Sequence, residues 1–443
     1  MRPEVAAGLA LLVALAAAPA RAEEGVTRER LEALERRIAE LEAEREERLA
    51  REAEEGLGDW TRRVRLSGSA NAGYFAGSDR SVFDDTSFQV WDARFFLDAD
   101  LGRDVVLGER PILRNLGLSF EWNLVRLGKL QNDVGELYVD FQGVLGAPWL
   151  NVQVGRFYIP FGENYLRFGR NYRDNPFITN TVGGPWWWDE GVRIYGSTRD
   201  GRFGWVASVS DGESEFAEDG DRDPQATLKL YGRPTSWLYL SASVLGSGGI
   251  GSDEIPAQGA VWLGEAWARQ VGDWADVPTF VDGAEVANAP PTLDHTWMAG
   301  VDAVLTHETF GRLWLAYGLY DIDAGASLYD RRLHYWIAEW VLQGRALAPE
   351  LTPFYLALRG SGLGSYDGDE GYLLDVRQSD TIGYNAESLT VYSLAIGWRI
   401  NRHVTIRSEY GHQEIELVHG VPREIRRHGG GADFFGVEVG ASF

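Results

Sequence analysis

The sequence predicts an all-β protein, a 16-stranded antiparallel transmembrane β-barrel preceded by a short N-terminal coiled-coil helix. Three observations lead to this fold class. Stretches of about 8 to 13 residues alternate apolar and polar side chains, Trp and Tyr gather at the ends of these stretches, and the connections sort by length. A chain of 443 residues is long enough for one large barrel.

Composition excludes several classes of function. The formal net charge of −24 argues against a nucleic-acid partner, because phosphate backbones are bound by basic surfaces. The absence of cysteine excludes disulfides, thiolate catalysis and cysteine-ligated metal sites. No apolar run beyond the N-terminus reaches the ~18 residues of a spanning helix, so we expect a membrane to be crossed by strands.

Residues 1–22 are expected to form a secretory signal peptide. Arg2 supplies the basic start, residues 5–18 form the apolar centre, and Ala20 and Ala22 complete a small-residue cleavage motif. A short transmembrane anchor is the alternative, but the apolar run is shorter than the ~18 residues that a span requires. The pattern therefore favours a signal peptide.

Residues 23–58 are expected to form a periplasmic helix with a short coiled-coil seam. Leu31, Leu34, Ile38 and Leu41 follow the a/d spacing of a coiled coil, and acidic and basic residues alternate on the other faces. The seam suits an oligomerisation stalk. The alternative is a lone charged helix that leads from the signal peptide to the fold.

Residues 59–443 carry the alternation expected of barrel strands. Leu116, Leu118, Phe120 and Trp122 alternate with small or polar residues, which places the two sets on opposite faces of a strand. A soluble sandwich shows the same alternation, so this pattern alone does not decide the fold. The expected strands lie near residues 64–76, 88–101, 114–126, 134–144, 149–159, 190–199, 202–211, 225–232, 236–247, 296–306, 310–322, 332–343, 352–360, 388–400, 402–414 and 434–443.

The lengths of the connections favour the membrane barrel. Tight turns fall on one side of the predicted strands, at residues 146–148, 200–201, 233–235, 307–309 and 401. Long loops fall on the other side, at residues 160–189, 248–295, 361–387 and 415–433. An even strand number with this sorting is typical of outer-membrane barrels. Residues 156–180 then form the third outward loop.

The third loop is basic and aromatic. Arg156, Arg167, Arg170 and Arg173 lie in a stretch, residues 155–180, that holds only two acidic residues. An arginine side chain pairs with two oxygens of a phosphate or carboxylate at once, so a run of arginines can form weak anion sites. The alternative is that these arginines pair with wall carboxylates and hold the loop in place. The two roles are compatible.

The same alternation assigns charged side chains to the inner wall. The predicted inner wall is mixed and leans acidic, with the cations Arg94, Arg193, Lys229, Arg312 and Arg407, and the acids Asp92, Asp98, Asp100, Glu121, Glu136, Asp140, Glu339, Glu409 and Glu438. The candidate pore-lining and anion-binding residues are Arg94, Arg156, Arg167, Arg170, Arg173, Arg193, Lys229 and Arg407.

Two segments resemble a known family. Residues 155–163, GRFYIPFGE, are similar to the G-[QR]-F-x-x-P-F-G-x-E segment of the phosphate-selective porin O/P family, and residues 188–196, WDEGVRIYG, resemble its R-D-x-G-V-x-x-x-G strand. The resemblance covers the whole mature chain in layout, but only these segments in motif. It implies a trimeric porin of the outer membrane of a Gram-negative-type bacterium. It further implies that the third loop, about 160–187, folds into the lumen and that anions such as phosphate pass.

The expected function is passive diffusion of small hydrophilic solutes, in particular anions such as phosphate, through a water-filled barrel. The alternative is a structural barrel that tethers the membrane to peptidoglycan or a partner through residues 23–58. No nucleophile motif or histidine ligand spacing occurs, so we expect no enzyme activity, catalytic residue, cofactor or metal site. The expected partners are outer-membrane lipid, small inorganic or organic anions and further copies in a homotrimer, with no nucleic acid.

Overall fold

The computed structural model describes most of the chain from residue 63 to residue 443. Residues 1–62, which include the expected signal peptide and coiled-coil helix, lie outside the described residues, as do Arg167, Arg170 and Arg173. The described residues are 63–78, 81–83, 86–107, 110–126, 128–163, 175–184, 188–212, 224–248, 250–251, 279–281, 284–286, 292–324, 331–365, 386–417 and 429–443.

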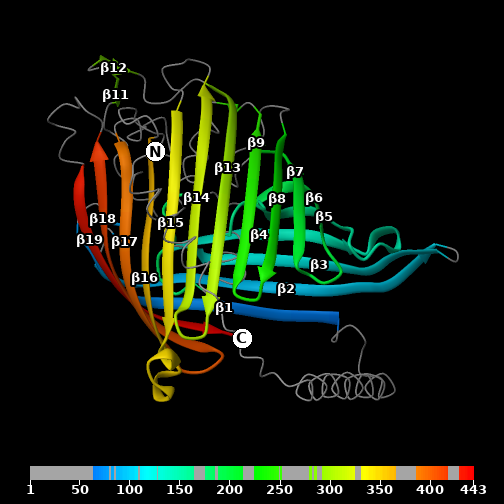
Figure 1. Cartoon of the computed structure of the whole chain (residues 1–443), viewed down its shortest axis with the longest axis horizontal. Coiled ribbons are helices and arrows are strands. Elements are labelled where there is room, and N and C mark those ends of the chain that lie inside the picture. The colour runs from blue at the N-terminus through cyan, green and yellow to red at the C-terminus, as the bar shows by residue number, and fades with distance from the viewer. Residues whose placement is uncertain are drawn as a thin grey trace. The chain divides into compact units, whose positions relative to one another are not determined.

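The described residues form a closed ring of sixteen antiparallel strands (Figure 1). The ring strands are β1 (Val64–Gly77), β2 (Ser87–Leu107), β3 (Arg110–Arg126), β4 (Lys129–Gln142), β5 (Asn151–Tyr158), β6 (Trp188–Ser197), β7 (Phe203–Ser210), β8 (Gln225–Thr235), β9 (Leu238–Ser247), β13 (Thr292–His307), β14 (Gly311–Ala324), β15 (Arg331–Gln343), β16 (Phe354–Ser365), β17 (Ala386–Arg399), β18 (Val404–Leu417) and β19 (Gly430–Ser442). Short β10 (Ile250–Gly251) extends the edge of β13, and β11 (Thr279–Val281) pairs with β12 (Ala284–Val286).

Pairing of the first and last strands closes the ring. β1 pairs with β19 from Ser69 opposite Ser442 to Gly77 opposite Phe434, and its other edge pairs with β2. β9 pairs with β13 across the connection that holds β10 to β12. A closed sheet leaves no strand edge unpaired, which is what a bilayer requires of backbone groups. The structure confirms the predicted all-β barrel of sixteen antiparallel strands.

The two faces of the ring have opposite chemistry. Along β8, Thr227 and Lys229 are buried, whereas Leu228 and Leu230 are 41% and 54% exposed. The other ring strands repeat this alternation, so the exposed outer face is apolar and the inner face carries most of the polar and charged side chains. A soluble sandwich would bury its apolar face. Alternation alone is compatible with a soluble sandwich or a membrane barrel. The exposed apolar outer face shows that the fold is the membrane barrel.

β2 and β3 are longer than the sequence predicts. The predicted strands end at residue 101 and resume at residue 114, whereas the pairing continues to Leu107 and resumes at Arg110. The register of this pair shifts at three places, one of them between Val105 and Val106. Such bulges insert an extra residue and break the alternation of side chains without ending the pairing. The sequence pattern therefore stops before the hairpin does.

Short 3-10 helices occupy two of the turns. η1 (Val144–Gly146) joins β4 to β5, while η4 (Gly344–Ala346) and η5 (Pro349–Leu351) join β15 to β16. No helix in the part of the chain that the structure describes is long and apolar enough to cross a membrane. These turns join strand ends on the same side of the ring as the other short connections.

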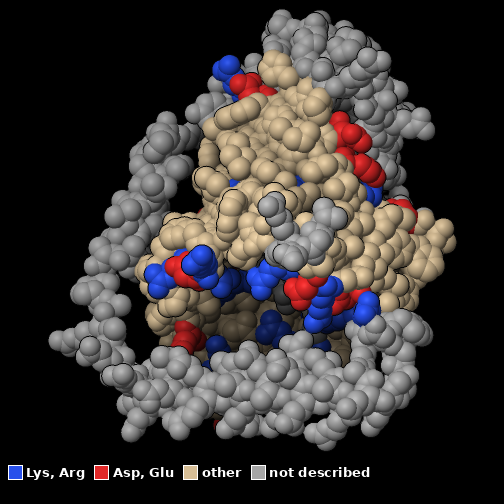
Figure 2. Space-filling view, turned by 90° about the vertical axis from the view of Figure 1, so that its right-hand side faces the viewer, with Lys and Arg blue, Asp and Glu red and all other residues tan. Residues whose placement is uncertain are grey.

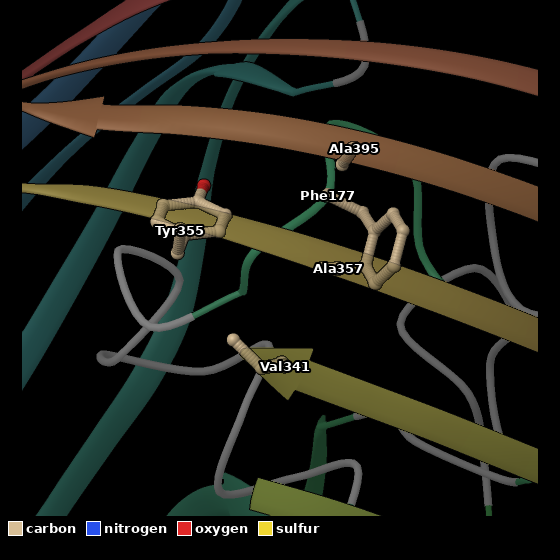
Figure 3. Close-up of a cluster of buried hydrophobic side chains, with 5 residues drawn as sticks. All are labelled: Phe177, Val341, Tyr355, Ala357 and Ala395. Atoms are coloured by element: carbon tan, nitrogen blue, oxygen red, sulfur yellow. The ribbon is translucent and has the colours of Figure 1, made fainter. Parts of the chain in front are cut away.

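Phe177 shows where the connection between β5 and β6 runs (Figure 3). Its ring is fully buried in a cluster with Val341 of β15, Tyr355 and Ala357 of β16, and Ala395 of β17. These four wall residues occupy inward-facing positions of adjacent strands. Phe177 therefore packs against the inner wall, inside the ring.

Candidate functional site

The described residues of the β5–β6 connection, 159–163 and 175–184, are almost completely buried, and we refer to them together as the inward segment. Phe161, Phe177 and Val182 are each 0% exposed. Because the outer face of the ring is exposed, this burial requires that the inward segment lie against inner-wall side chains.

The inward segment reaches the wall opposite its own strands. β16 lies eight strands from β5 in either direction around the ring. The backbone N–H of Val182 donates to Ser361 Oγ of β16 at 3.0 Å, and the N–H of Gly184 donates to Tyr320 Oη of β14 at 3.0 Å. The chain then returns to β6 at Trp188. The inward segment thus crosses the interior of the ring.

Glu163 joins the inward segment to β8 and β9. Its Oε1 accepts from Lys229 Nζ at 2.8 Å, from Tyr239 Oη at 2.6 Å and from Ser241 Oγ at 3.2 Å. Lys229 is 0% exposed and also donates to the carbonyl oxygen of Gly162. A buried ammonium is stable only when acceptors surround it, and the loop supplies both of these. We call this group the Glu163 tether.

A second carboxylate, that of Asp302, lies next to the Glu163 tether. Asp302 of β13 accepts from the indole N–H of Trp314 at 3.0 Å, and Ser241 Oγ lies 3.3 Å from its other oxygen. Ser241 is within hydrogen-bond distance of both Asp302 and Glu163. The hydroxyl therefore lies between the loop carboxylate and the wall carboxylate and can donate to one of them at a time, while Trp314 donates to the latter.

Glu409 of β18 joins the second part of the inward segment to the wall. Its Oε2 accepts from the backbone N–H groups of Ile178 at 2.7 Å and Thr179 at 2.8 Å, and its Oε1 accepts from Thr179 Oγ1 at 2.7 Å. The Glu409 side chain is 0% exposed. Hydrogen bonds to a buried carboxylate are stronger than neutral ones, so this contact orders the loop backbone. We call this group, with Arg359, the Glu409 tether.

Arg359 of β16 completes the Glu409 tether. Its Nη1 donates to the carbonyl oxygen of Thr179 at 3.0 Å, its Nη2 donates to Thr179 Oγ1 at 2.6 Å, and Nη2 lies 3.4 Å from Glu409. Its guanidinium carbon lies 4.1 Å from the centre of the Phe177 ring, a cation–π contact. The hydroxyl of Thr179 thus accepts from the arginine and donates to the carboxylate.

Two of the predicted site residues hold the inward segment. Lys229 belongs to the Glu163 tether. Arg407 of β18 donates through Nη1 to the carbonyl oxygens of Asn175 at 2.5 Å and Phe177 at 3.2 Å, and through Nε to Glu438 at 2.7 Å. Both cations are almost fully buried. The structure therefore brings them together with the loop.

Arg94 and Arg193 lie on the inner wall in contacts of their own. Arg94 donates to Asp92 at 2.8 Å, and its other guanidinium nitrogen lies 3.3 Å from Glu121. Arg193 donates to Gln153 Oε1 at 2.6 Å and to the carbonyl oxygen of Tyr158 at 3.0 Å. Arg94 is 3% exposed and Arg193 is 9% exposed. None of these four contacts involves the inward segment.

Arg156 lies on the outer face of the barrel. β5 continues to Tyr158, so Arg156 is a strand residue and shares its face with Val154, which is 44% exposed. Its Nη1 lies 2.6 Å from Glu190 Oε1, and its Nε donates to the carbonyl oxygen of Gly135 at 3.0 Å. The structure therefore does not bring Arg156 together with the other predicted site residues.

Arg359, Asp302 and Thr179 are among the residues at the two tethers that sequence reasoning missed. Arg359 carries a signal that could have found it, because it is a single charge on the same face as Ala357 and Ser361. Asp302 carries a comparable signal, because it is the charged residue among the inward-facing positions of β13 between Thr296 and Thr306. Thr179 carries no such signal, because nothing in its sequence context indicates that a wall carboxylate lies opposite it.

The described residues enclose two sizeable cavities, among others, at the end of the barrel that carries the short turns. The larger, of about 470 Å³, extends from Glu163 to Arg233, Trp237 and Arg312. The smaller, of about 370 Å³, lies beside Arg114 and is also lined by β4 and β5 residues. Figure 2 shows a hollow on one face of the molecule with basic and acidic side chains at its edge. In the part of the chain described, no group of three potential metal ligands occurs.

Comparisons with known proteins bear on the fold. A scan against protein-family models finds no match, and a search of curated protein sequences finds none either. Among solved structures, the outer membrane channel DcaP of Acinetobacter baumannii is similar, with 14% identity and a TM-score of 0.52 over 86% of this chain and 97% of that chain. OprB of Pseudomonas putida is similar with 13% identity and a TM-score of 0.51, over 86% and 95% of the two chains.

A third solved structure is similar to this chain at a comparable identity and TM-score. OmpT, described as an outer membrane protein of Vibrio cholerae in trimer form, has 11% identity and a TM-score of 0.51 over 86% of this chain and 99% of that chain. At these identities the likeness shows the fold alone, which is that of an outer-membrane β-barrel. Together with the apolar outer face of the sixteen-stranded ring, it places the chain in the outer membrane. The narrower resemblance to the phosphate-selective porin O/P family stays a prediction.

Proposed function

We propose that the chain is an outer-membrane porin for passive diffusion of small hydrophilic solutes, and that residues 160–187 narrow its lumen. One observation carries the proposal. Two separate groups of buried hydrogen bonds hold the inward segment across the ring, at Glu163 and at Glu409. A barrel whose connecting loop only covered the mouth would need no such contacts with the middle of the opposite wall. A narrow point inside a closed barrel is how pores select solutes by size and charge.

The proposed preference is for small anions such as phosphate, and it depends on the third-loop arginines. The wall cations Lys229, Arg359 and Arg407 each pair with a buried carboxylate, which largely balances their charges. Arg167, Arg170 and Arg173 supply further positive charge close to the inward segment in the sequence. A planar guanidinium suits phosphate and carboxylate oxygens, so these arginines are the proposed source of the preference.

We also propose that the porin is a homotrimer. The ion pair of Arg156 with Glu190 lies on the outer face, where Val154 and Leu137 are exposed. A charged side chain that faces lipid is unfavourable except near the interfaces. A second copy of the chain that covers this part of the wall would provide polar partners. Native mass spectrometry of detergent-purified protein tests the assembly, and a monomer would contradict it.

Planar-bilayer recording tests the porin function. We expect discrete conductance steps from the purified chain, with a reversal potential in a salt gradient that indicates anion preference. Arg167→Gln and Arg170→Gln should shift that reversal potential toward the cation side. A preference for cations that neither substitution alters would contradict the anion proposal. An absence of conductance would contradict the porin proposal and favour the tethering barrel, whose envelope attachment should then be lost on deletion of residues 23–55.

A further inference from the structure

The larger cavity at the short-turn end combines aromatic surface with exposed positive charge. We propose that it is a binding subsite for small aromatic carboxylates, through which such solutes pass on one side of the narrowing. The inference rests on the proposed porin function and names a solute class for it. We call this site the short-turn cavity. Its volume of about 470 Å³ is within the range of small-molecule sites, roughly 300 to 1,000 Å³.

Aromatic side chains provide the apolar part of the short-turn cavity. Trp237, Tyr239 and Trp314 line it together with Val304. The hydroxyl of Tyr239 is donated to Glu163, and the indole N–H of Trp314 is donated to Asp302. Because its hydroxyl bonds within the protein, the half-buried Tyr239 offers mainly its ring to a ligand, whereas Trp314 is only 2% exposed. Trp237 is 37% exposed and adds a second accessible ring. Aromatic side chains of this kind can pack against the ring of an aromatic solute.

The exposed charge of the short-turn cavity is positive. Arg233 is exposed, and its guanidinium carbon lies 5.9 Å from the centre of the Tyr239 ring. Arg312 is 35% exposed, whereas its partner Glu339 is 0% exposed, with 3.2 Å between their atoms. Glu163 is also buried, and three donors occupy one of its oxygens. Arg233, Arg312 and the carboxylate of Glu163 therefore line the cavity, with three donors on one oxygen of that carboxylate, while Glu339 is buried in the wall.

The spatial order of these groups indicates the ligand class. A guanidinium beside an aromatic ring can bind a carboxylate with two N–H groups while the ring packs against the rest of the solute. An inorganic anion would use Arg233 and leave the rings without contact. A neutral sugar would use the rings and leave Arg233 without an anionic partner. An aromatic carboxylate such as benzoate uses both.

Titration calorimetry on the full chain in detergent tests the subsite with benzoate as the probe. We expect saturable binding, because the cavity is preformed. Arg233→Gln should weaken it about tenfold or more, as expected for loss of a charge-assisted hydrogen bond. Trp237→Ala should weaken benzoate binding and leave any phosphate binding unchanged. Both residues are exposed, so these variants should fold, which the heat-dependent mobility shift on denaturing gels verifies.

Arg114→Gln is the matched control, because it removes one positive charge beside the smaller cavity at the same end of the barrel. Benzoate affinity should not change in this variant. Equal loss of affinity in Arg114→Gln and Arg233→Gln would overturn the subsite, because it would indicate a general effect of charge. Binding of glucose or phosphate as tight as that of benzoate would also overturn it.

The binding and conductance measurements separate this inference from the porin proposal. Conductance without saturable benzoate binding would overturn the subsite and leave passive diffusion supported. Benzoate binding that depends on Arg233 in a chain without conductance would support the subsite and contradict the porin. Reduction of the open-channel current by millimolar benzoate, and relief of that block in Arg233→Gln, would support both.

Discussion

The two tethers hold the same loop by opposite means. In the Glu163 tether the loop supplies the charged side chain, and the wall supplies Lys229 and hydroxyl groups. In the Glu409 tether the wall supplies both charges, Glu409 and Arg359, while the loop supplies backbone groups and a single hydroxyl, that of Thr179. The first tether therefore depends on one loop residue. The second depends on the wall.

This difference indicates which positions control the path of the loop. Backbone N–H and C=O groups are present in every sequence, so the hydrogen bonds that Glu409 and Arg359 make to backbone groups do not require a particular loop side chain. A change at Glu163 removes the acceptor that Lys229 requires. Four sets of variants distinguish the tethers, and they follow in order of expected effect.

Glu409→Ala should have the largest effect. It removes the acceptor of two backbone N–H groups and one hydroxyl and leaves Arg359 buried without its carboxylate, which costs about 3–5 kcal/mol of unfolding free energy. Urea unfolding in lipid vesicles measures the loss, and conductance should become larger and noisier as the loop is released. Glu416→Ala, an exposed acid on the outer face of the same strand, is the control. Similar losses for both variants would contradict the tether.

Gly183→Ala should destabilise the Glu409 side of the loop by steric overlap. Gly183 has a φ of 72°, and an added Cβ would lie 2.5 Å from Tyr335 Cβ. Backbone strain and overlap together should cost about 2–4 kcal/mol. Gly162→Ala is the matched control, since its φ is 59° but its added Cβ would meet nothing closer than Asp302 at 3.5 Å. It should cost about 1–2 kcal/mol, the strain alone. Equal unfolding free energies would contradict the packing described.

Glu163→Gln should have an intermediate effect. The amide keeps an acceptor for Tyr239, and Lys229 keeps the carbonyl oxygen of Gly162, so the loss should be about 1–3 kcal/mol. Asp200→Asn is the control, because it breaks an ion pair with Arg202 in an exposed turn, where the two side chains are 59% and 66% exposed, and should have little effect on the unfolding free energy. Both are measured by urea unfolding, and a larger loss at Asp200 would reverse the expected order.

Thr179→Ala should have the smallest effect, about 1 kcal/mol, because it removes only the hydroxyl and leaves the backbone contacts of Glu409 and Arg359. Thr179→Ser keeps the hydroxyl and should restore the unfolding free energy. If Thr179→Ala destabilised the protein as much as Glu409→Ala, the side chain rather than the backbone would hold the loop, and the contrast between the tethers would fail.

The sequence predicted the strands better than the contacts that fill the barrel. Alternation is a local property, so β8 and β17 could be located from their own residues, and their inward faces followed. Bulges defeat this reasoning, as in β2, because they change parity without ending a strand. From the sequence, Arg156 is expected in the loop, although it has the same outward parity as Val152 and Val154 in β5.

The tethers could not be predicted, because their members are far apart in the chain. Glu163 and Lys229 are 66 residues apart, and Thr179 and Glu409 are 230 residues apart. Which inward carboxylate meets which loop residue depends on how deep the loop reaches and on the register of the ring. Neither is encoded in a short stretch of sequence.

The distance in sequence between Thr179 and Glu409 has a consequence for how the protein folds. Contacts between remote residues form slowly, because a long stretch of chain must first be ordered. The wall groups of the Glu409 tether lie on β16 and β18, close to the C-terminus. We therefore expect the barrel to assemble as an open sheet with an unplaced loop, and the lumen to narrow only as the last strands join. Pulsed hydrogen exchange should show the amides of Ile178 and Thr179 gaining protection together with β18, and earlier protection would contradict this order.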